Sequence, residues 1–177
     1  MAINYSLILY MAFENIQFEG LYEKTLVIVK PDGVQRGLVG EVIRRLELKG
    51  LKIVGLKMAQ LNPDKLREHY AHLAEKPFYP GLEGFMMKNP VVIMALEGKG
   101  AVEAVRLIAG VTNAGKADGG TIRGDLAMGM CNVIHCSDSP ENGQIEVKRF
   151  FNDGEVFNYD KTEYLHVYME DERAGLR

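Results

Sequence analysis

The sequence predicts a single α/β domain in which a β-sheet is covered by helices. Short runs of β-branched and aliphatic residues alternate with segments whose apolar residues recur at helical spacing. The 177 residues suffice for one domain with a core of its own. The predicted order is β-α-β-α-β-α-loop-β-α. It fits a split β-α-β (ferredoxin-like) sandwich and a small doubly wound sheet equally well, so the order alone does not choose between them.

The first predicted strand covers residues 25–30, a β-branched apolar run that is stopped by the turn-forming residues 31–33. Residues 39–49 predict a helix because Val, Val, Ile and Leu side chains share one face, with Arg44 and Arg45 outside it. Gly50 then supplies a C-terminal stop.

A second strand is predicted over residues 52–61. Asn62 followed by Pro63 is typical of an N-cap and a first helical position, so we expect a helix from there to about Glu75. Residues 77–88 predict a turn and a shorter helix.

The rest of the domain begins with a predicted strand over residues 91–96 and a helix over 101–109. Residues 110–124 are rich in Gly, Asn, Asp and Thr and predict a long loop, which in a compact domain is often functional. A short strand over 132–135 and a final helix over 140–151 complete the pattern.

The net charge and the cysteine count disfavour some classes of ligand and some cellular locations. The formal net charge of −3 does not favour binding to nucleic acid or to a membrane surface, so any anionic ligand must be held by local basic residues. Two cysteines, Cys131 and Cys136, are too few to stabilise a secreted fold by disulfide bonds. A reducing, cytoplasmic location is therefore expected.

The two ends of the chain are expected to lie outside the domain. Residues 1–22 lack the basic region and cleavage site of a secretory signal, and their apolar run is too short to span a membrane. We therefore expect an N-terminal extension over 1–22, one domain over 23–170 and a C-terminal tail over 171–177.

The segment from Asn132 to Ser139 carries the clearest chemical signal. His135 leaves a predicted strand and is followed by small polar residues, which is a way to present an imidazole at the edge of a pocket. A nucleophilic imidazole needs an acceptor on its other nitrogen, and Glu146 in the next helix could fold back to supply one. A lone histidine is more often structural, so this pattern alone leaves both interpretations open.

The sequence Asn132-x-x-His135-x-Ser137-Asp138-Ser139 resembles the active-site signature of nucleoside diphosphate kinases. Other segments resemble the same family in the same order, from about Lys24 to about Tyr168. They are residues 30–40, 68–70, 76–78, 81–82, 84–85, 90–92, Arg106, 112–113 and 120–125.

The resemblance implies a fold, a reaction and partners. The fold would be ferredoxin-like, βαββαβ, an α+β sandwich with a four-stranded antiparallel sheet covered by helices, assembled as a homo-oligomer (hexamer or tetramer). The reaction would be ping-pong transfer of the γ-phosphate of ATP to nucleoside diphosphates through a phosphohistidine, maintaining NTP pools. Mg²⁺ would be bound with the nucleotide phosphates, so no metal-ligating residue is expected.

The resemblance also implies the site residues. His135 would be the nucleophile, and Glu146 and Ser137 would fix its imidazole. Phosphates and ribose would be held by Lys30, Tyr70, Arg106, Thr112, Arg123 and Asn132, and the base would be covered by Phe78 and Leu82. These residue types suit phosphoryl transfer, whose loose and highly charged transition state calls mainly for positioning and neutralisation.

Two alternative functions stay open. A catalytically silent scaffold of the same fold and a nucleic-acid-binding sheet are rivals, although the strands lack the aromatic pattern of such sheets. Residues 110–117 nearly form a Walker A loop, but Ala117 lacks the required hydroxyl and the segment follows a helix. His69 and His72 are interpreted as structural rather than as a metal pair.

Three positions depart from the family pattern. Cys136 stands where the family usually has Gly or Ala, and we hypothesise that it makes the enzyme sensitive to oxidation. Ala114 replaces a common Pro. The segment from Asp125 to Asn132 is about one residue shorter than in the family and has Met130-Cys131 in place of the usual Gly-Arg, so either Met128 or Met130 is expected to pack on the second face of the base.

Overall fold

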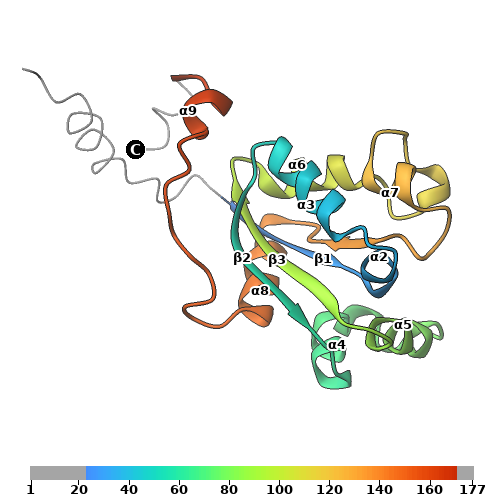
Figure 1. Cartoon of the computed structure of the whole chain (residues 1–177). Helices are drawn as coiled ribbons and strands as arrows, with labels where there is room; N and C mark the ends of the chain where they lie inside the picture. Colours follow the sequence, from blue (N-terminus) through green and yellow to red (C-terminus); the bar gives the residue numbers. More distant parts are fainter. Residues whose placement is uncertain (1–22, 171–177) are drawn as a thin grey trace, which may run out of the picture.

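The computed structural model describes residues 23–170 (Figure 1). The expected N-terminal extension and C-terminal tail lie outside the described residues. Within the described part, no helix is long and apolar enough to cross a membrane.

The four strands form one antiparallel sheet. They are β1 (Glu23–Val29), β2 (Lys52–Ala59), β3 (Val91–Gly98) and β4 (Ile134–Cys136), in the spatial order β2-β3-β1-β4. Every ladder in this sheet is antiparallel. This order and orientation confirm the ferredoxin-like α+β class and exclude the doubly wound parallel sheet.

Helices cover both faces of the sheet (Figure 1). The helices of the described residues are α2 (Pro31–Gln35), α3 (Val39–Leu48), α4 (Pro63–His69), α5 (Tyr79–Met87), α6 (Ala101–Ala109), α7 (Ile122–Leu126), α8 (Pro140–Phe150) and α9 (Tyr164–Val167). Two 3₁₀ turns, Ala71–Leu73 and Ala114–Lys116, follow α4 and α6.

The core has two halves because side chains alternate across β1. Val27 and Val29 are buried with residues of α3 and α6 on one face. Leu26 and Ile28 are buried with residues of α4, α5 and α8 on the other. Both faces of β1 are therefore buried from Thr25 to Val29.

Three expectations about local structure are wrong. The expected turn at residues 31–33 is the start of α2. The helix that begins after the Asn62 cap ends at His69 rather than near Glu75, because Tyr70 leaves the helical region (φ −104°, ψ 32°) and the chain continues as a 3₁₀ turn. The expected loop over 110–124 contains the second 3₁₀ turn and the start of α7.

The misplaced elements all border one end of the sheet. There α2 follows β1, the end of α4 approaches α8, and α7 precedes β4. Each is short, and a helix of five to seven residues depends on tertiary contacts rather than on its own propensity. These contacts build the site described next.

Candidate functional site

A cavity of about 1030 Å³ opens where the residue that follows β1 meets α4, α5, α6, α7, β4 and α8. Of the site residues expected from the sequence, all except Ser137 line it. They are Lys30, Tyr70, Phe78, Leu82, Arg106, Thr112, Arg123, Asn132, His135 and Glu146. Residues scattered over more than a hundred positions are thus brought to one cavity.

His135 projects from β4 and is fixed by a carboxylate from α8. Its Nε2 lies 3.1 Å from Oε2 of Glu146, and the side chain of His135 remains 18% exposed. Ser137 does not reach the cavity, but its Oγ donates a 2.6 Å hydrogen bond to the same carboxylate oxygen. The Ser137 Oγ also accepts a hydrogen bond from the Leu26 N–H at 3.0 Å, which ties the group to β1.

This arrangement sets the state of the imidazole. Burial alone would raise the pKa of Glu146, but the hydrogen bonds from His135 and Ser137 outweigh it and hold that pKa below its usual range. An ionised Glu146 accepts a hydrogen bond from Nε2–H of His135. The other nitrogen, Nδ1, is then unprotonated and available as a nucleophile.

His69, for which the sequence favours a structural role over metal binding, packs directly on His135. The two rings meet edge to face with centroids 4.5 Å apart, and Nδ1 of His69 lies 3.8 Å from Oε1 of Glu146. Burial lowers the pKa of His69 to about 3, so this ring is neutral. The signal that could have found it was its place in the segment Glu68-His69-Tyr70. His72, by contrast, is exposed.

Among the described residues, His69, His135 and Glu146 are the three whose ligand-type atoms lie within 4.8 Å of one another. Two imidazoles and a carboxylate suit a borderline cation such as Zn²⁺. However, Nη1 of Arg149 lies 3.4 Å from Nδ1 of His69 and places a positive charge against the group. The cluster is therefore better suited to orienting His135 than to holding a metal ion.

Cationic and amide groups line the cavity beside His135. Nζ of Lys30 donates a 2.7 Å hydrogen bond to Oδ1 of Asn132, whose Nδ2 donates to the Thr112 carbonyl at 2.7 Å. Burial, reinforced by the charge of Arg123, lowers the pKa of Lys30 to about 8. A lysine whose charge is disfavoured in this way is prepared for an anionic ligand.

Arg123 reaches the cavity from α7 and is buried. Its Nη1 donates to the Gly110 carbonyl at 2.7 Å and its Nη2 to the Ile134 carbonyl at 2.9 Å. These bonds join α7 to the end of α6 and to β4, next to the histidine. Burial also lowers the pKa of the guanidinium, which at ordinary pH stays charged.

The backbone beside the histidine is strained. Val133 has φ +68°, a conformation that a β-branched residue adopts rarely. It is held there by two hydrogen bonds: its N–H donates to Oδ2 of Asp32 at 3.0 Å, and its carbonyl accepts from the Lys30 N–H at 2.8 Å. Strain of this kind is kept only where the surroundings enforce it, and here it sets the direction in which β4 presents His135. Nothing in the sequence pattern indicated it.

The far end of the cavity is apolar. Phe78 is exposed there, while Leu82 is partly buried against the core. Met130 lines the cavity and Met128 does not, which favours Met130 as the residue facing Phe78. Tyr70 is buried, and burial raises the pKa of its hydroxyl.

Both cysteines line the same cavity. Cys131 is exposed and Cys136 is half-buried. Burial raises the pKa of Cys136, although Arg123 and Arg106 oppose the shift. The thiol beside the histidine therefore faces the guanidinium groups of the site.

Comparisons with known proteins agree with this geometry. The family model described as nucleoside diphosphate kinase matches residues 23–156. A nucleoside diphosphate kinase of Parabacteroides distasonis is 50% identical over 151 residues, which cover 85% of this chain and 99% of the relative. One from Pyrococcus abyssi is 48% identical over 145 residues, which cover 80% and 91%.

Solved structures show the same likeness. A halophilic nucleoside diphosphate kinase from Halobacterium salinarum in complex with CDP superimposes with a TM-score of 0.81 at 43% identity, covering 83% of this chain and 99% of that one. A nucleoside-diphosphate kinase from Borrelia burgdorferi, with bound vanadate and ADP as a transition-state mimic, gives 0.78 at 34% identity. It covers 82% and 96%.

Proposed function

The chain belongs to the nucleoside diphosphate kinase family, and from this premise we propose that His135 carries the phosphoryl group between the two nucleotides. Members of the family transfer phosphate between nucleotides, and this chain is such an enzyme. The proposal concerns which residues perform the transfer and how.

The observation that carries the proposal is the pairing of His135 with Glu146 at the wall of a cavity that also holds Lys30, Arg106 and Arg123. Glu146 keeps the proton on Nε2, so Nδ1 is the attacking atom. In the first half-reaction Nδ1 forms a bond to the γ-phosphorus of ATP, the bond to the bridging oxygen breaks, and ADP leaves with that oxygen.

The second half-reaction reverses these steps with a different nucleotide. A terminal phosphate oxygen of a nucleoside diphosphate attacks the phosphorus on His135, the P–N bond breaks, and a nucleoside triphosphate leaves. One site therefore serves both nucleotides in turn, which is ping-pong kinetics. The catalytic residues in this scheme are His135, Glu146 and Ser137, the last acting through the carboxylate.

The remaining cavity residues hold the nucleotide. Arg106 and Arg123 are suited to fork onto phosphate oxygens, and Lys30 adds a point charge. Thr112, Asn132 and Tyr70 lie where they can bond phosphate or ribose. At the apolar end, Phe78 and Leu82, with Met130 opposite, cover the base. Stacking of this kind is tolerant of base identity.

Mg²⁺ is the cation proposed to accompany the nucleotide. It takes six oxygen ligands and keeps several waters. The cavity residues nearest the phosphate site are mainly cations and amides, with the exposed carboxylate of Asp138 at its edge. These residues fit a cation that arrives with the phosphates, whose charge it neutralises, and not one held in a protein cage.

Assembly and location are also proposed. Leu56 and Met58 are exposed on the edge strand β2. An edge with apolar side chains supports a homo-oligomer, either a hexamer or a tetramer, and light scattering on the purified protein measures which. We place the protein in the cytoplasm, with residues 23–170 as the catalytic domain, 1–22 as an extension and 171–177 as a tail.

The experiment that tests the proposal is transfer of label from γ-phosphate-labelled ATP to the protein. The wild type is expected to form an acid-labile, alkali-stable phosphoenzyme, and His135→Ala is expected to form none while still binding ADP. His72→Ala is the matched control, since His72 is an exposed histidine of the same cavity. Labelling of His135→Ala at the wild-type level would refute the proposal, and failure of the wild type to label would favour a silent scaffold.

A further inference from the structure

We propose that Arg45 is a positioning residue that holds Arg123 in the phosphate site by clamping α7 to α3 through Asp125. The inference rests on the proposed function, because it takes Arg123 to be a phosphate ligand. Arg45 itself does not line the cavity. In the sequence it reads only as an exposed basic residue on the outer face of a helix.

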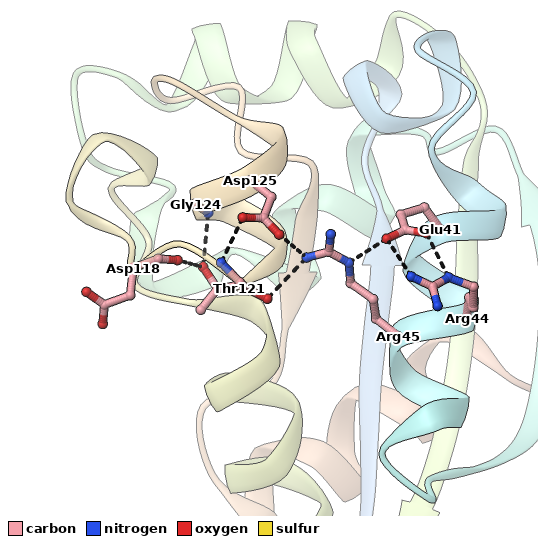
Figure 2. A network of polar contacts seen from close by, with 8 residues as sticks. Glu41, Arg44, Arg45, Asp118, Thr121, Gly124 and Asp125 are labelled. Atoms are coloured by element: carbon pink, nitrogen blue, oxygen red, sulfur yellow. Dashed lines mark hydrogen bonds and ion pairs between the residues drawn. The ribbon is translucent and has the colours of Figure 1, made fainter.

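Arg45 connects two parts of the chain that are far apart in sequence (Figure 2). Its Nε donates a 2.7 Å hydrogen bond to Oε1 of Glu41, one turn earlier in α3. Its Nη1 donates to Oδ2 of Asp125 in α7 at 2.7 Å and to the Gly120 carbonyl just before that helix at 3.2 Å. The Arg45 guanidinium therefore links α3 both to α7 and to the loop just before α7.

Asp125 is bound from both sides. Its Oδ1 accepts the Gly120 N–H at 2.7 Å while Oδ2 accepts Arg45. The bond from Gly120, followed by that from Arg45, holds the pKa of Asp125 below its usual range. The side chains of Arg45 and Asp125 are 19% and 32% exposed, so the pair is partly shielded from water. A partly shielded pair whose carboxylate is also held by a backbone N–H fixes geometry better than an open surface pair does.

The helix α7 connects the anchored Asp125 to Arg123 in the cavity. Arg123 and Asp125 are two residues apart, which places their side chains about 200° apart around a helix. One side of α7 is held against α3 by Asp125, and the opposite side directs Arg123 toward Gly110, Ile134 and the cavity. A rotation or shift of this turn would therefore move the Arg123 guanidinium.

A helix as short as α7 needs such support. It has five residues, fewer than an isolated helix needs to be stable. Thr121 caps it by accepting the Gly124 N–H at 3.0 Å, and Ile122 is buried in the core. Arg36 donates to the Leu126 carbonyl at 2.5 Å. Of these contacts, the Arg45 bridge is the one that ties both the loop just before α7 and the helix itself to α3.

The neighbouring Arg44 provides a matched control. It pairs with the same Glu41, its Nε lying 3.0 Å from Oε2, but its side chain is 61% exposed and its hydrogen bonds stay within α3. Arg44→Met and Arg45→Met thus remove the same charge and a bond to the same carboxylate. Only the second change releases α7.

The test compares Arg45→Met, Arg44→Met, Asp125→Asn, the double variant Arg45→Met/Asp125→Asn and the reference Arg123→Met. For each full-length protein, the Kd for ADP, KM, kcat, their pH profile and the Tm are measured. Arg45→Met is expected to weaken ADP binding and raise KM about tenfold, because a displaced contact of this kind costs that order of magnitude or more. The pH profile is expected to stay as in the wild type, since the pairing of His135 with Glu146 is untouched.

Asp125→Asn is expected to show a similar loss, and the double variant no more than the larger single one, because both remove the same bridge. Arg44→Met is expected to stay within twofold of the wild type. The inference is overturned if Arg45→Met binds ADP like Arg44→Met, or if the losses of Arg45→Met and Asp125→Asn multiply in the double variant. If Arg123→Met itself binds ADP normally, the phosphate role given to Arg123 is wrong, an outcome distinct from failure of the clamp.

Discussion

The carboxylate of Glu146 lies 3.1 Å from Nε2 of His135 and so decides which ring nitrogen is left for chemistry. The second contact of that carboxylate, a 2.6 Å hydrogen bond from Ser137, fixes its position on α8 relative to β4. In the proposed mechanism the tautomer of His135 is therefore set by the ionisation of Glu146, which the lowered pKa of Glu146 maintains at neutral pH.

Glu146→Gln tests this relationship. An amide keeps the shape but cannot carry the negative charge, so the imidazole loses its fixed tautomer, and we expect transfer to fall roughly 100-fold. ADP binding should change little, because the cations proposed to bind phosphate are untouched. The control is Glu141→Gln, an exposed glutamate on the same helix, and equal rates for the two variants would contradict the role of Glu146.

The pKa of Lys30 predicts how nucleotide binding depends on pH. Without ligand that pKa is about 8, and a bound phosphate favours the charged form and raises it. Between pH 8 and the higher pKa of the complex, the free protein has lost a proton that the complex keeps. Affinity for ADP should therefore weaken as pH rises above 8, by up to about tenfold per pH unit.

Calorimetric titration with ADP between pH 7 and 10 measures this effect. Lys30→Met should bind more weakly throughout but with a flatter profile over that range. A wild-type profile that is as flat as that of Lys30→Met would show that this lysine does not contribute its charge to the phosphate site.

The thiol of Cys136 predicts sensitivity to oxidation. It is half-buried and faces Arg123 and Arg106. A peroxide that converts it to a sulfenic acid, with release of water, therefore places a bulkier group beside the two arginines proposed to bind phosphate. Cys136→Gly should resist inactivation by hydrogen peroxide, and bound nucleotide should protect the wild type. Because burial raises the pKa of this thiol, inactivation should be faster at alkaline pH.

Cys131→Ser is the matched control, since Cys131 is the exposed cysteine of the same cavity. If Cys131→Ser resists peroxide and Cys136→Gly does not, the hypothesis about Cys136 is wrong.

The helix that carries Glu146 packs so closely on β1 that position 143 has room only for glycine. A Cβ at this position would lie 2.3 Å from the Lys24 carbonyl of β1, too close for any heavy atom. Gly143→Ala should force α8 away from the sheet and lower stability by about 1–3 kcal/mol. At this chain length that corresponds to a fall in Tm of about 2–4 °C per kcal/mol.

Gly119→Ala provides the comparison by thermal unfolding, because a Cβ there meets no atom within 4 Å. If Gly143→Ala melts at the same temperature as Gly119→Ala, α8 has more freedom against β1 than this close approach implies.

The longer elements could be predicted from the sequence because their own patterns define them. The helix over Ala101–Ala109 begins and ends where the pattern indicated, and the Asn62 side chain caps α4 as its position before Pro63 suggested. The order of the strands in the sheet could not be predicted from such local patterns. Local periodicity fitted two folds, and only the resemblance across the whole domain favoured the antiparallel one.

The parts that could not be predicted depend on contacts distant in sequence. The sequence of the segment that contains α7 predicts a loop because Gly, Thr and Asp dominate it. The segment forms a helix because Ile122 is buried in the core and Arg45 binds Asp125. His69 belongs to the site only because α4 ends where α8 passes, 80 residues later. The positive φ of Val133 likewise follows from bonds to Lys30 and Asp32.

The most direct test of the central claim follows the phosphoryl group itself through His135. The protein is incubated with γ-phosphate-labelled ATP, freed of nucleotide, and divided; one part is mapped by mass spectrometry at alkaline pH and the other is mixed with GDP. We predict one phosphate per chain, on His135, and its transfer to form labelled GTP. Label on another residue, or label on His135 that GDP cannot remove, would contradict the account.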